Sequence, residues 1–270
     1  MRTRPLLQAD IAAARSLVQV RPYANCFLAS MLERGSVGEL VGVFEDADLR
    51  AIATVGANCV PSALNTGTAA ALALHLAQAG RRSASIVGRR EDVALLWQAL
   101  DGRWGPARDT RPAQPLMVLT TDARVPADPR VRRGTEEDFD LLFPCCVEMF
   151  TAEVGVSPVS RGMETAYRSR IRDTITSGRS FVRVDDGVVV FKTEVGAISS
   201  AACQLQGVWV NPELRGRGLA APALAAVAAT ALREIAPAVE LYVNDFNTAA
   251  RRAYERVGFE YVDTFATVFF

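Results

Sequence analysis

The chain has 270 residues, of which 50% are hydrophobic and 22% charged, a composition typical of a folded globular protein rather than a disordered one. Thirty basic residues balance thirty acidic ones, so no net positive field attracts a polyanion, and no nucleic-acid partner is expected. Five cysteines without metal-ligand spacing and a single histidine, His75, argue against a metal site, and none is expected.

The N-terminus carries Asp10 before a secretory apolar segment of ~7 to 15 residues could form. The longest apolar run, 219–232, contains Pro222 and is shorter than the ~18 residues that a membrane span needs. We therefore expect a cytoplasmic protein that has no membrane partner and is a monomer or homodimer. Lys192 is the only lysine in the chain, which we attribute to coding bias in a GC-rich genome.

The N-terminal half alternates predicted helices and strands. Helices are predicted at 10–20, 68–78 and 91–100, a strand pair around 45–48, and a single strand at 83–87. The segment 86–97 has the succession of strand, polar break and helix that recurs at 242–254. This recurrence predicts a tandem duplication.

Between the two halves, residues 104–129 contain five prolines, which is typical of a linker, and a short strand is predicted within them at 116–119. We place the domain boundary near residue 125. The predicted domains are therefore 1–125, which includes the proline-rich linker, and 126–270.

In the C-terminal half, Asp185-Asp186-Gly187 lies between β-branched runs and predicts a hairpin of strands 181–184 and 188–191. The remaining predicted elements are a strand at 204–210, a helix ending near Pro237, a strand at 239–243, a helix at 247–256 closed by Gly258, and a strand at 261–270. The order predicts an α/β (α+β) fold in which each domain is a mixed, mostly antiparallel sheet flanked by helices.

Residues 211–221 form a glycine-rich turn between a strand and a helix. Gly216 and Gly218 allow the backbone to approach a ligand closely, and the helix N-terminus stabilises an anion. Arg215 and Arg217 add charged donors suited to phosphate oxygens. A P-loop is excluded because no Gly-x-x-x-x-Gly-Lys-Ser/Thr occurs, and the dinucleotide fingerprint is incomplete. A plain strand-helix turn with a capping glycine is the structural alternative.

Arg215, Gly218 and Ala220 form an Arg-x-x-Gly-x-Ala motif, and a second segment, Asn247-Thr-Ala-Ala-Arg-Arg-Ala-Tyr-Glu-Arg-Val-Gly-Phe, follows ~30 residues later. Both motifs, in this order, resemble those of the GNAT superfamily of N-acetyltransferases. The resemblance implies two GNAT-like domains and acetyl-CoA as the cosubstrate. The residues that it assigns to acetyl-CoA are Val208, Trp209, Val210, Arg215, Gly216, Arg217, Gly218, Leu219, Ala220, Ala221, Asn247, Ala250 and Tyr254.

The resemblance also implies roles within this set. The backbones of Val208 and Val210 would pair with the pantetheine arm where two parallel strands separate, as if the arm were another strand. Residues 216–221 would hold the pyrophosphate. Tyr254 would donate a proton to the leaving thiolate. The alternative for Tyr254 is a tyrosine packed in an amphipathic helix.

The general base stays open. GNAT enzymes often carry a glutamate on the strand that contacts pantetheine, whereas this chain has Gln204 and Gln206 there. Glu194, on the neighbouring predicted strand, is the first substitute.

Three further carboxylates remain as alternatives. Glu148 and Glu153 lie in a helical segment expected to border the acceptor pocket. The terminal carboxylate of Phe270 is the last, since the protein myristoyltransferases use such a group. Each candidate has the alternative of a structural ion pair.

The N-terminal half departs from the family pattern. Its corresponding loop, 62–68, has one glycine and no arginine, and Glu91 and Gln98 replace the asparagine and tyrosine of the second motif. We expect a degenerate GNAT-like domain that shapes the acceptor pocket or stabilises the pair. Such tandem arrangements resemble those of mycothiol synthase and the myristoyltransferases.

These observations predict an acetyl-CoA-dependent N-acetyltransferase that transfers the acetyl group directly to a primary amine of a small molecule, peptide or protein. The missing strand glutamate leaves a non-catalytic acyl-CoA-binding regulator as an alternative, and a longer acyl donor as another. Transfer from aminoacyl-tRNA is disfavoured by the intact phosphate loop and the neutral net charge.

Overall fold

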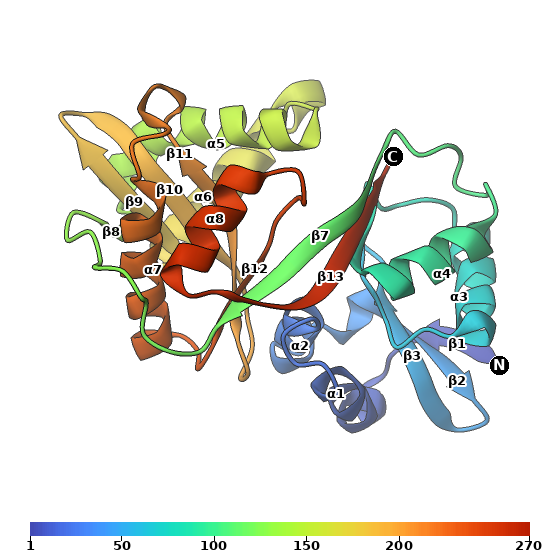
Figure 1. Cartoon of the computed structure of the whole chain (residues 1–270). Helices are drawn as coiled ribbons and strands as arrows, with labels where there is room; N and C mark the ends of the chain where they lie inside the picture. The colour runs from blue at the N-terminus through green and yellow to red at the C-terminus, as the bar shows by residue number, and fades with distance from the viewer.

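The computed structural model describes residues 1–270 apart from the side chain of Arg161. Two lobes flank a continuous mixed sheet of nine strands in the order β4-β6-β13-β7-β12-β11-β10-β9-β8, and a second sheet has the order β1-β2-β3-β5 (Figure 1). Helices flank both sheets, which confirms the predicted fold class. Within the described part of the chain, every helix is too short or too polar to cross a bilayer.

The N-terminal half contains the predicted alternation of helices and strands. Its elements are β1 (Arg2–Pro5), α1 (Ile11–Gln19), α2 (Cys26–Glu33), β2 (Leu40–Glu45), β3 (Asp48–Thr54), β4 (Asn58–Cys59), β5 (Pro61–Ser62), α3 (Thr66–Ala79), β6 (Ser85–Arg89), α4 (Arg90–Leu100) and β7 (Asp109–Leu119). The sequence did not predict α2. Its buried residues include Cys26, Leu28, Met31 and Leu32, so it lacks the polar stripe by which an amphipathic helix is recognised.

The C-terminal half follows the predicted order. Its elements are β8 (Arg132–Arg133), α5 (Phe139–Val154), α6 (Glu164–Thr176), β9 (Ser180–Asp185), β10 (Val188–Ile198), β11 (Cys203–Val210), α7 (Ala220–Glu234), β12 (Val239–Tyr242), α8 (Thr248–Val257) and β13 (Glu260–Phe269). The hairpin is confirmed, since Asp186 and Gly187 both have positive φ, 49° and 77°, as a two-residue hairpin turn requires.

The linker interpretation is wrong for residues 109–115, whereas the short strand predicted at 116–119 is confirmed. Both segments belong to β7, a strand of 11 residues that begins at Asp109 rather than at Leu116. Its prolines are compatible with pairing because a strand also needs acceptors, and Pro115 contributes its carbonyl, which accepts from Val243 N at 3.2 Å. Proline content alone therefore concealed a central strand.

The two halves exchange their last strands. β7, from the N-terminal half, lies between β12 and β13 of the C-terminal half. β13 in turn pairs along its other edge with β6, from Phe265↔Arg89 to Phe269↔Ser85. Figure 1 shows these two long strands side by side between the lobes. The boundary near residue 125 falls in the loop after β7, yet each half's sheet is completed by a strand of the other.

The C-terminal sheet is covered on both faces. α7 and α8 pack on one face, in a core that contains Leu224, Val227 and Tyr254. α5 and α6 cover the other face, in a core that contains Phe139 and Trp209. α2 of the N-terminal half also contacts β10 and β11. The edge between β11 and β12 is therefore bordered by both halves of the molecule.

Candidate functional site

A gap opens between β11 and β12. These parallel strands are paired only at Cys203↔Val239 and Gln204↔Glu240. On its other edge, β11 stays paired with β10 as far as Val210. Beyond Gln204, one edge of β11 therefore has no strand partner, which is the geometry that an extended amide-containing arm needs to bind as an added strand.

The unpaired edge belongs to the predicted valines. Asn211 N donates to Val190 O at 3.0 Å, so this residue faces β10. Because backbone groups alternate along a strand, Val210 directs its N–H and C=O toward the gap, and so does Val208. Just before them, Gly207 has φ +63° where the β10–β11 register shifts, which marks a β-bulge.

Trp209 does not reach the gap. Its indole is 5% exposed and packs in the core under α5 and α6, on the opposite face from α7. Its register partner is Lys192 of β10. The Trp209 side chain, a predicted acetyl-CoA contact, therefore lies on the opposite face of the sheet from α7.

The loop that follows β11 presents free donors. The backbone N–H groups of residues 216–221 donate to no acceptor within the described part of the chain, and no side chain caps α7. Gly216 and Gly218 both have φ +75°, and no atom lies within 4 Å of a Cβ added to either. A run of free amides at a helix N-terminus is the standard arrangement for binding a phosphate.

Two guanidinium groups border this loop. Arg215 Nε donates to Val210 O at 3.1 Å, and Arg217 Nη2 donates to Glu213 O at 3.3 Å. Both side chains belong to exposed residues, and none of the described carboxylates lies within 4.0 Å of either one. Their charge is thus available to a phosphate.

α8 supplies the second predicted motif. Asn247 Oδ1 accepts from Ala250 N at 3.2 Å and so caps the helix, and Ala250 packs against the α7 core. Tyr254 is 6% exposed, with its ring 6.1 Å from that of Phe259.

The Tyr254 hydroxyl has no hydrogen-bond partner among the described residues, yet it is not sealed from solvent. Burial, with a smaller contribution from the charge of Glu153, raises the pKa of Tyr254 well above its ordinary value. The phenol therefore keeps its proton at neutral pH, as a proton donor must.

Glu194 lies in a polar cluster under α6. Its Oε1 accepts from Gln206 Nε2 at 2.6 Å and forms an ion pair with Arg170, and its side chain is 10% exposed. Gly196 makes room for this contact, because a Cβ there would stand 2.4 Å from the Gln206 side chain. The sequence did not identify Arg170, because no local pattern marks a helical arginine that reaches a strand.

A cavity of about 450 Å³ adjoins this cluster, between α6 and the edges of β10 and β11. Gln206, Arg170, Asp173 and Arg179 are among the residues that line it. Gln206 precedes the bulge at Gly207, so the cavity approaches the open edge of β11 from the α6 side. This is a suitable entry for an acceptor molecule.

The candidate bases Glu148 and Glu153 both lie on α5 and are exposed. Glu153 lies near the end of α5, with its Oε1 3.9 Å from Arg111 Nη1. The charge of Glu153 contributes to the raised pKa values of Tyr242 and Tyr254. Of Glu148 and Glu153, it is therefore Glu153 that lies toward Tyr254.

Phe270 lies in the N-terminal half. Its backbone N donates to Ala84 O, and its ring centroid is 5.5 Å from those of Trp97 and Trp104. The strand exchange carries the chain end into this core, away from Tyr254. The structure therefore contradicts the terminal carboxylate as a base for the C-terminal site.

The corresponding loop of the N-terminal half satisfies several of its own donors. Asn65 Oδ1 accepts from Thr68 N at 2.9 Å, and Thr68 Oγ1 accepts from Asn65 N at 2.8 Å. Asp92 Oδ1 accepts from Leu64 N at 2.7 Å, which places a buried carboxylate beside the start of α3. A phosphate would meet the Asp92 carboxylate there and would find the N–H groups of Leu64, Asn65 and Thr68 already bonded, in contrast to residues 216–221.

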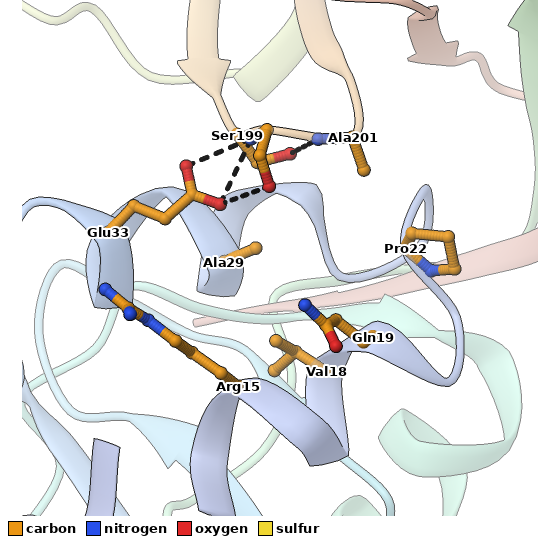
Figure 2. A pocket seen from close by; sticks show the side chains of 9 residues that line it. Arg15, Val18, Gln19, Pro22, Ala29, Glu33, Ser199 and Ala201 are labelled. Carbon is orange, nitrogen blue, oxygen red and sulfur yellow. Dashed lines mark hydrogen bonds between the residues drawn. The ribbon is translucent and has the colours of Figure 1, made fainter. Parts of the chain in front are cut away.

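A second cavity, of about 300 Å³, lies between α1, α2 and the β10–β11 turn (Figure 2). Glu33 Oε1 and Oε2 accept from Ser200 Oγ and N at 2.8 and 3.0 Å. These bonds fasten the turn that precedes β11 to the N-terminal half. The principal polar contact of this cavity is thus structural.

Comparisons with known proteins match two family models to different parts of the chain. Residues 148–259 match the description "Acetyltransferase (GNAT) family", and residues 38–142 match "Domain of unknown function (DUF4081)". No match was found among the curated proteins.

Solved structures match along the whole chain. A GCN5-related N-acetyltransferase from Sphaerobacter thermophilus is 17% identical with a TM-score of 0.64, over 98% of this chain and 94% of that one. A GNAT-family acetyltransferase from Colwellia psychrerythraea is 13% identical with a TM-score of 0.59, over 100% of both chains. A tandem GNAT protein from the clavulanic acid biosynthesis pathway is 15% identical with a TM-score of 0.58, over 99% of this chain and 98% of that one. These matches confirm the predicted tandem fold.

Proposed function

The chain belongs to the GNAT acetyltransferase family, and from this premise we propose that it is an acetyl-CoA-dependent N-acetyltransferase whose donor site lies in its C-terminal half. The acceptor is a primary amine on a small molecule, peptide or protein. Transfer is direct, from the thioester to the amine, without a covalent enzyme intermediate.

The observation that carries the proposal is that two backbone surfaces without a backbone partner follow one another along the chain. The edge of β11 at Val208 and Val210 has no strand partner, although Val210 O accepts from the Arg215 side chain, and it leads directly into the unpaired amides of residues 216–221. The first surface suits the amide groups of pantetheine, and the second suits a pyrophosphate. A donor bound across both would place its thioester toward Gly207 and the point where the strands separate.

The proposed chemistry uses two groups that border this end. The protonated Tyr254 hydroxyl supplies the proton that the leaving thiolate takes up. Glu194, with one carboxylate oxygen held by Gln206 and Arg170, accepts the proton of the attacking amine through its other oxygen. The amine enters through the cavity beside Gln206, where Asp173 offers a carboxylate to a cationic acceptor.

The test is to incubate the purified full-length protein with acetyl-CoA and a panel of amines, following thiol release and product mass. Acetylated product on at least one amine is expected. Propionyl- and longer acyl-CoA donors in parallel reactions report the preferred acyl length. Tight acetyl-CoA binding without turnover on any amine would favour the regulatory alternative and contradict the enzyme proposal.

A further inference from the structure

Lys192 is the only lysine in the chain, and it is buried. It lies on β10 opposite Trp209 and is 3% exposed. Its ammonium faces the Cys146 thiol of α5, where it opposes the rise in the Cys146 pKa that burial causes. None of the described carboxylates lies within 4.0 Å of Lys192 Nζ.

A buried cation without a counterion is unfavourable for folding. The other buried cation of this sheet, Arg183 on β9, is compensated by ion pairs with Asp128, at 2.8 Å, and with Asp185. The carboxylate on Lys192's own strand, Glu194, is instead engaged by Arg170 and Gln206. Lys192 thus carries a charge that the folded protein leaves without an ion-pair partner.

The position of this charge is specific. Lys192 Nζ lies 3.0 Å from where a Cβ on Gly207 would stand, directly over the bulge of β11. Met149 of α5 covers the same spot, with its sulfur 3.2 Å from that Cβ position. The bulge precedes Val208, so in the proposed donor site the ammonium lies at the acyl end and not at the phosphate end.

We propose that the Lys192 ammonium is a catalytic group that stabilises negative charge on the thioester oxygen, an inference that rests on the proposed function. As the acceptor nitrogen bonds to the carbonyl carbon and loses a proton to Glu194, the carbonyl electron pair moves onto the oxygen, which faces the ammonium. The carbon–sulfur bond then breaks, the oxygen re-forms its double bond, and the thiolate takes a proton from Tyr254. Lys192 donates no proton in this sequence. The negative charge that pairs with its ammonium is the one that develops on the thioester oxygen during the reaction.

If Lys192 were purely structural, its replacement would lower the melting temperature and leave the rate of acetyl transfer unchanged; the proposal predicts the reverse. Replacing a lysine that is 3% exposed and has no carboxylate partner by a methionine of similar shape removes a charge that no ion pair compensates and keeps the packing. Lys192→Met should therefore preserve or raise the melting temperature while it slows acetyl transfer. Loss of activity together with gain of stability separates a functional charge from a structural one.

The experiment compares Lys192→Met with Arg183→Met, which removes a buried but paired cation outside the site. For Lys192→Met we expect an unchanged or higher Tm, a Kd for acetyl-CoA within about twofold of the wild type, and a kcat lowered roughly 10²- to 10³-fold, as for loss of an oxyanion donor. Arg183→Met should lower Tm and leave the kcat of the folded protein nearly unchanged. Lys192→Arg, which keeps the charge, should recover part of the lost kcat.

Three results would overturn the inference. A Lys192→Met kcat within about threefold of the wild type would leave the ammonium no electrostatic role in the reaction. A fall in Tm like that of Arg183→Met would make the lysine structural. Acetylation of Lys192 itself during turnover, detected by mass at this sole lysine, would make it an acceptor instead. If the wild type binds acetyl-CoA but transfers to no amine, the proposed function fails, and this inference fails with it.

Discussion

Gln204 Nε2 donates a hydrogen bond to Glu240 Oε1 across 2.6 Å, at the last residue pair before β11 and β12 separate. Glu240 is fully buried, and its Oε2 is the one buried side-chain oxygen or nitrogen without a partner in the described part of the molecule. Burial raises the pKa of Glu240 to about 8, against the smaller opposing effect of the Gln204 bond. The strands therefore separate at a carboxyl group that is mostly protonated at neutral pH.

This carboxyl group makes stability depend on pH. The pKa of the Glu240 carboxyl is 4.5 in the unfolded chain and about 8 in the folded protein. Between these pH values the native state binds more protons than the unfolded state, so the free energy of unfolding falls as pH rises. Glu240→Gln should remove this dependence and be more stable than the wild type at pH ~8, by on the order of a few kcal/mol. Urea unfolding at several pH values measures it, with Glu255→Gln on the exposed face of α8 as control. Equal pH slopes in wild type and Glu240→Gln would contradict the assignment.

The proton-donor role of Tyr254 predicts a selective loss of rate. Tyr254→Phe removes only the hydroxyl, which has no partner in the protein, so Tm and acetyl-CoA affinity should change little. kcat should fall roughly 10²- to 10⁴-fold, the usual contribution of a general acid. Tyr261→Phe is the control, since that hydroxyl bonds to Thr264 on an exposed side chain. Unchanged turnover of Tyr254→Phe would leave Tyr254 a packing residue.

The phosphate-binding role of the loop is tested by two matched glycines. Gly218 has φ +75° and Gly187 of the β9–β10 hairpin has φ +77°, and a Cβ on either meets no atom within 4 Å. Alanine should cost each position similar backbone strain, roughly 1 to 2 kcal/mol. Only Gly218→Ala should also weaken acetyl-CoA binding, by about fivefold or more in a calorimetric titration. Equal affinities for the two variants would remove the loop from the donor site.

The two loops predict one donor site per chain. In the N-terminal loop the N–H groups of Leu64, Asn65 and Thr68 are bonded and the Asp92 carboxylate lies nearby, whereas the N–H groups of residues 216–221 are free. Calorimetry should give one equivalent of acetyl-CoA, and charge removal at Arg215 and Arg217 together should abolish it. Asp92→Asn should add no second equivalent. A stoichiometry of two would show that the N-terminal half is not degenerate.

The strand exchange predicts that the halves depend on each other for folding. A fragment of residues 126–270 lacks β7, so β12 and β13 both lose the strand between them. It should show no cooperative thermal transition by circular dichroism. A longer fragment, 104–270, restores β7 and should recover part of the transition. Cooperative unfolding of 126–270 near the Tm of the full chain would mean that the exchange is dispensable.

Much of the fold was evident from local patterns. The Asp186-Gly187 turn needs positive φ at both residues, and these residue types supply it without any distant contact. The glycines of 216–221 and the cap at Asn247 are equally local, so the donor loop and α8 could be predicted. The structure leaves the roles of these residues as predictions, and it places the Trp209 side chain in the core under α5 and α6.

Long-range pairing is where the sequence alone failed. The sequence predicted a strand only at 116–119. Nothing local distinguishes residues 109–115 from a linker, because their partners lie more than a hundred residues further along the chain, in β13. The same exchange moved Phe270 away from Tyr254. α2 was missed because burial between the halves leaves it without an amphipathic pattern.

The residues that surround the reaction centre were decided by tertiary structure. In the sequence, nothing distinguishes Lys192 from an ordinary strand lysine. Its buried position without a counterion results from the packing of α5 and the bulge at Gly207. Local sequence determines backbone conformation through φ, ψ and periodicity. Charge environment instead depends on which distant groups the fold brings near, and that is settled by the pairing of strands across the whole chain.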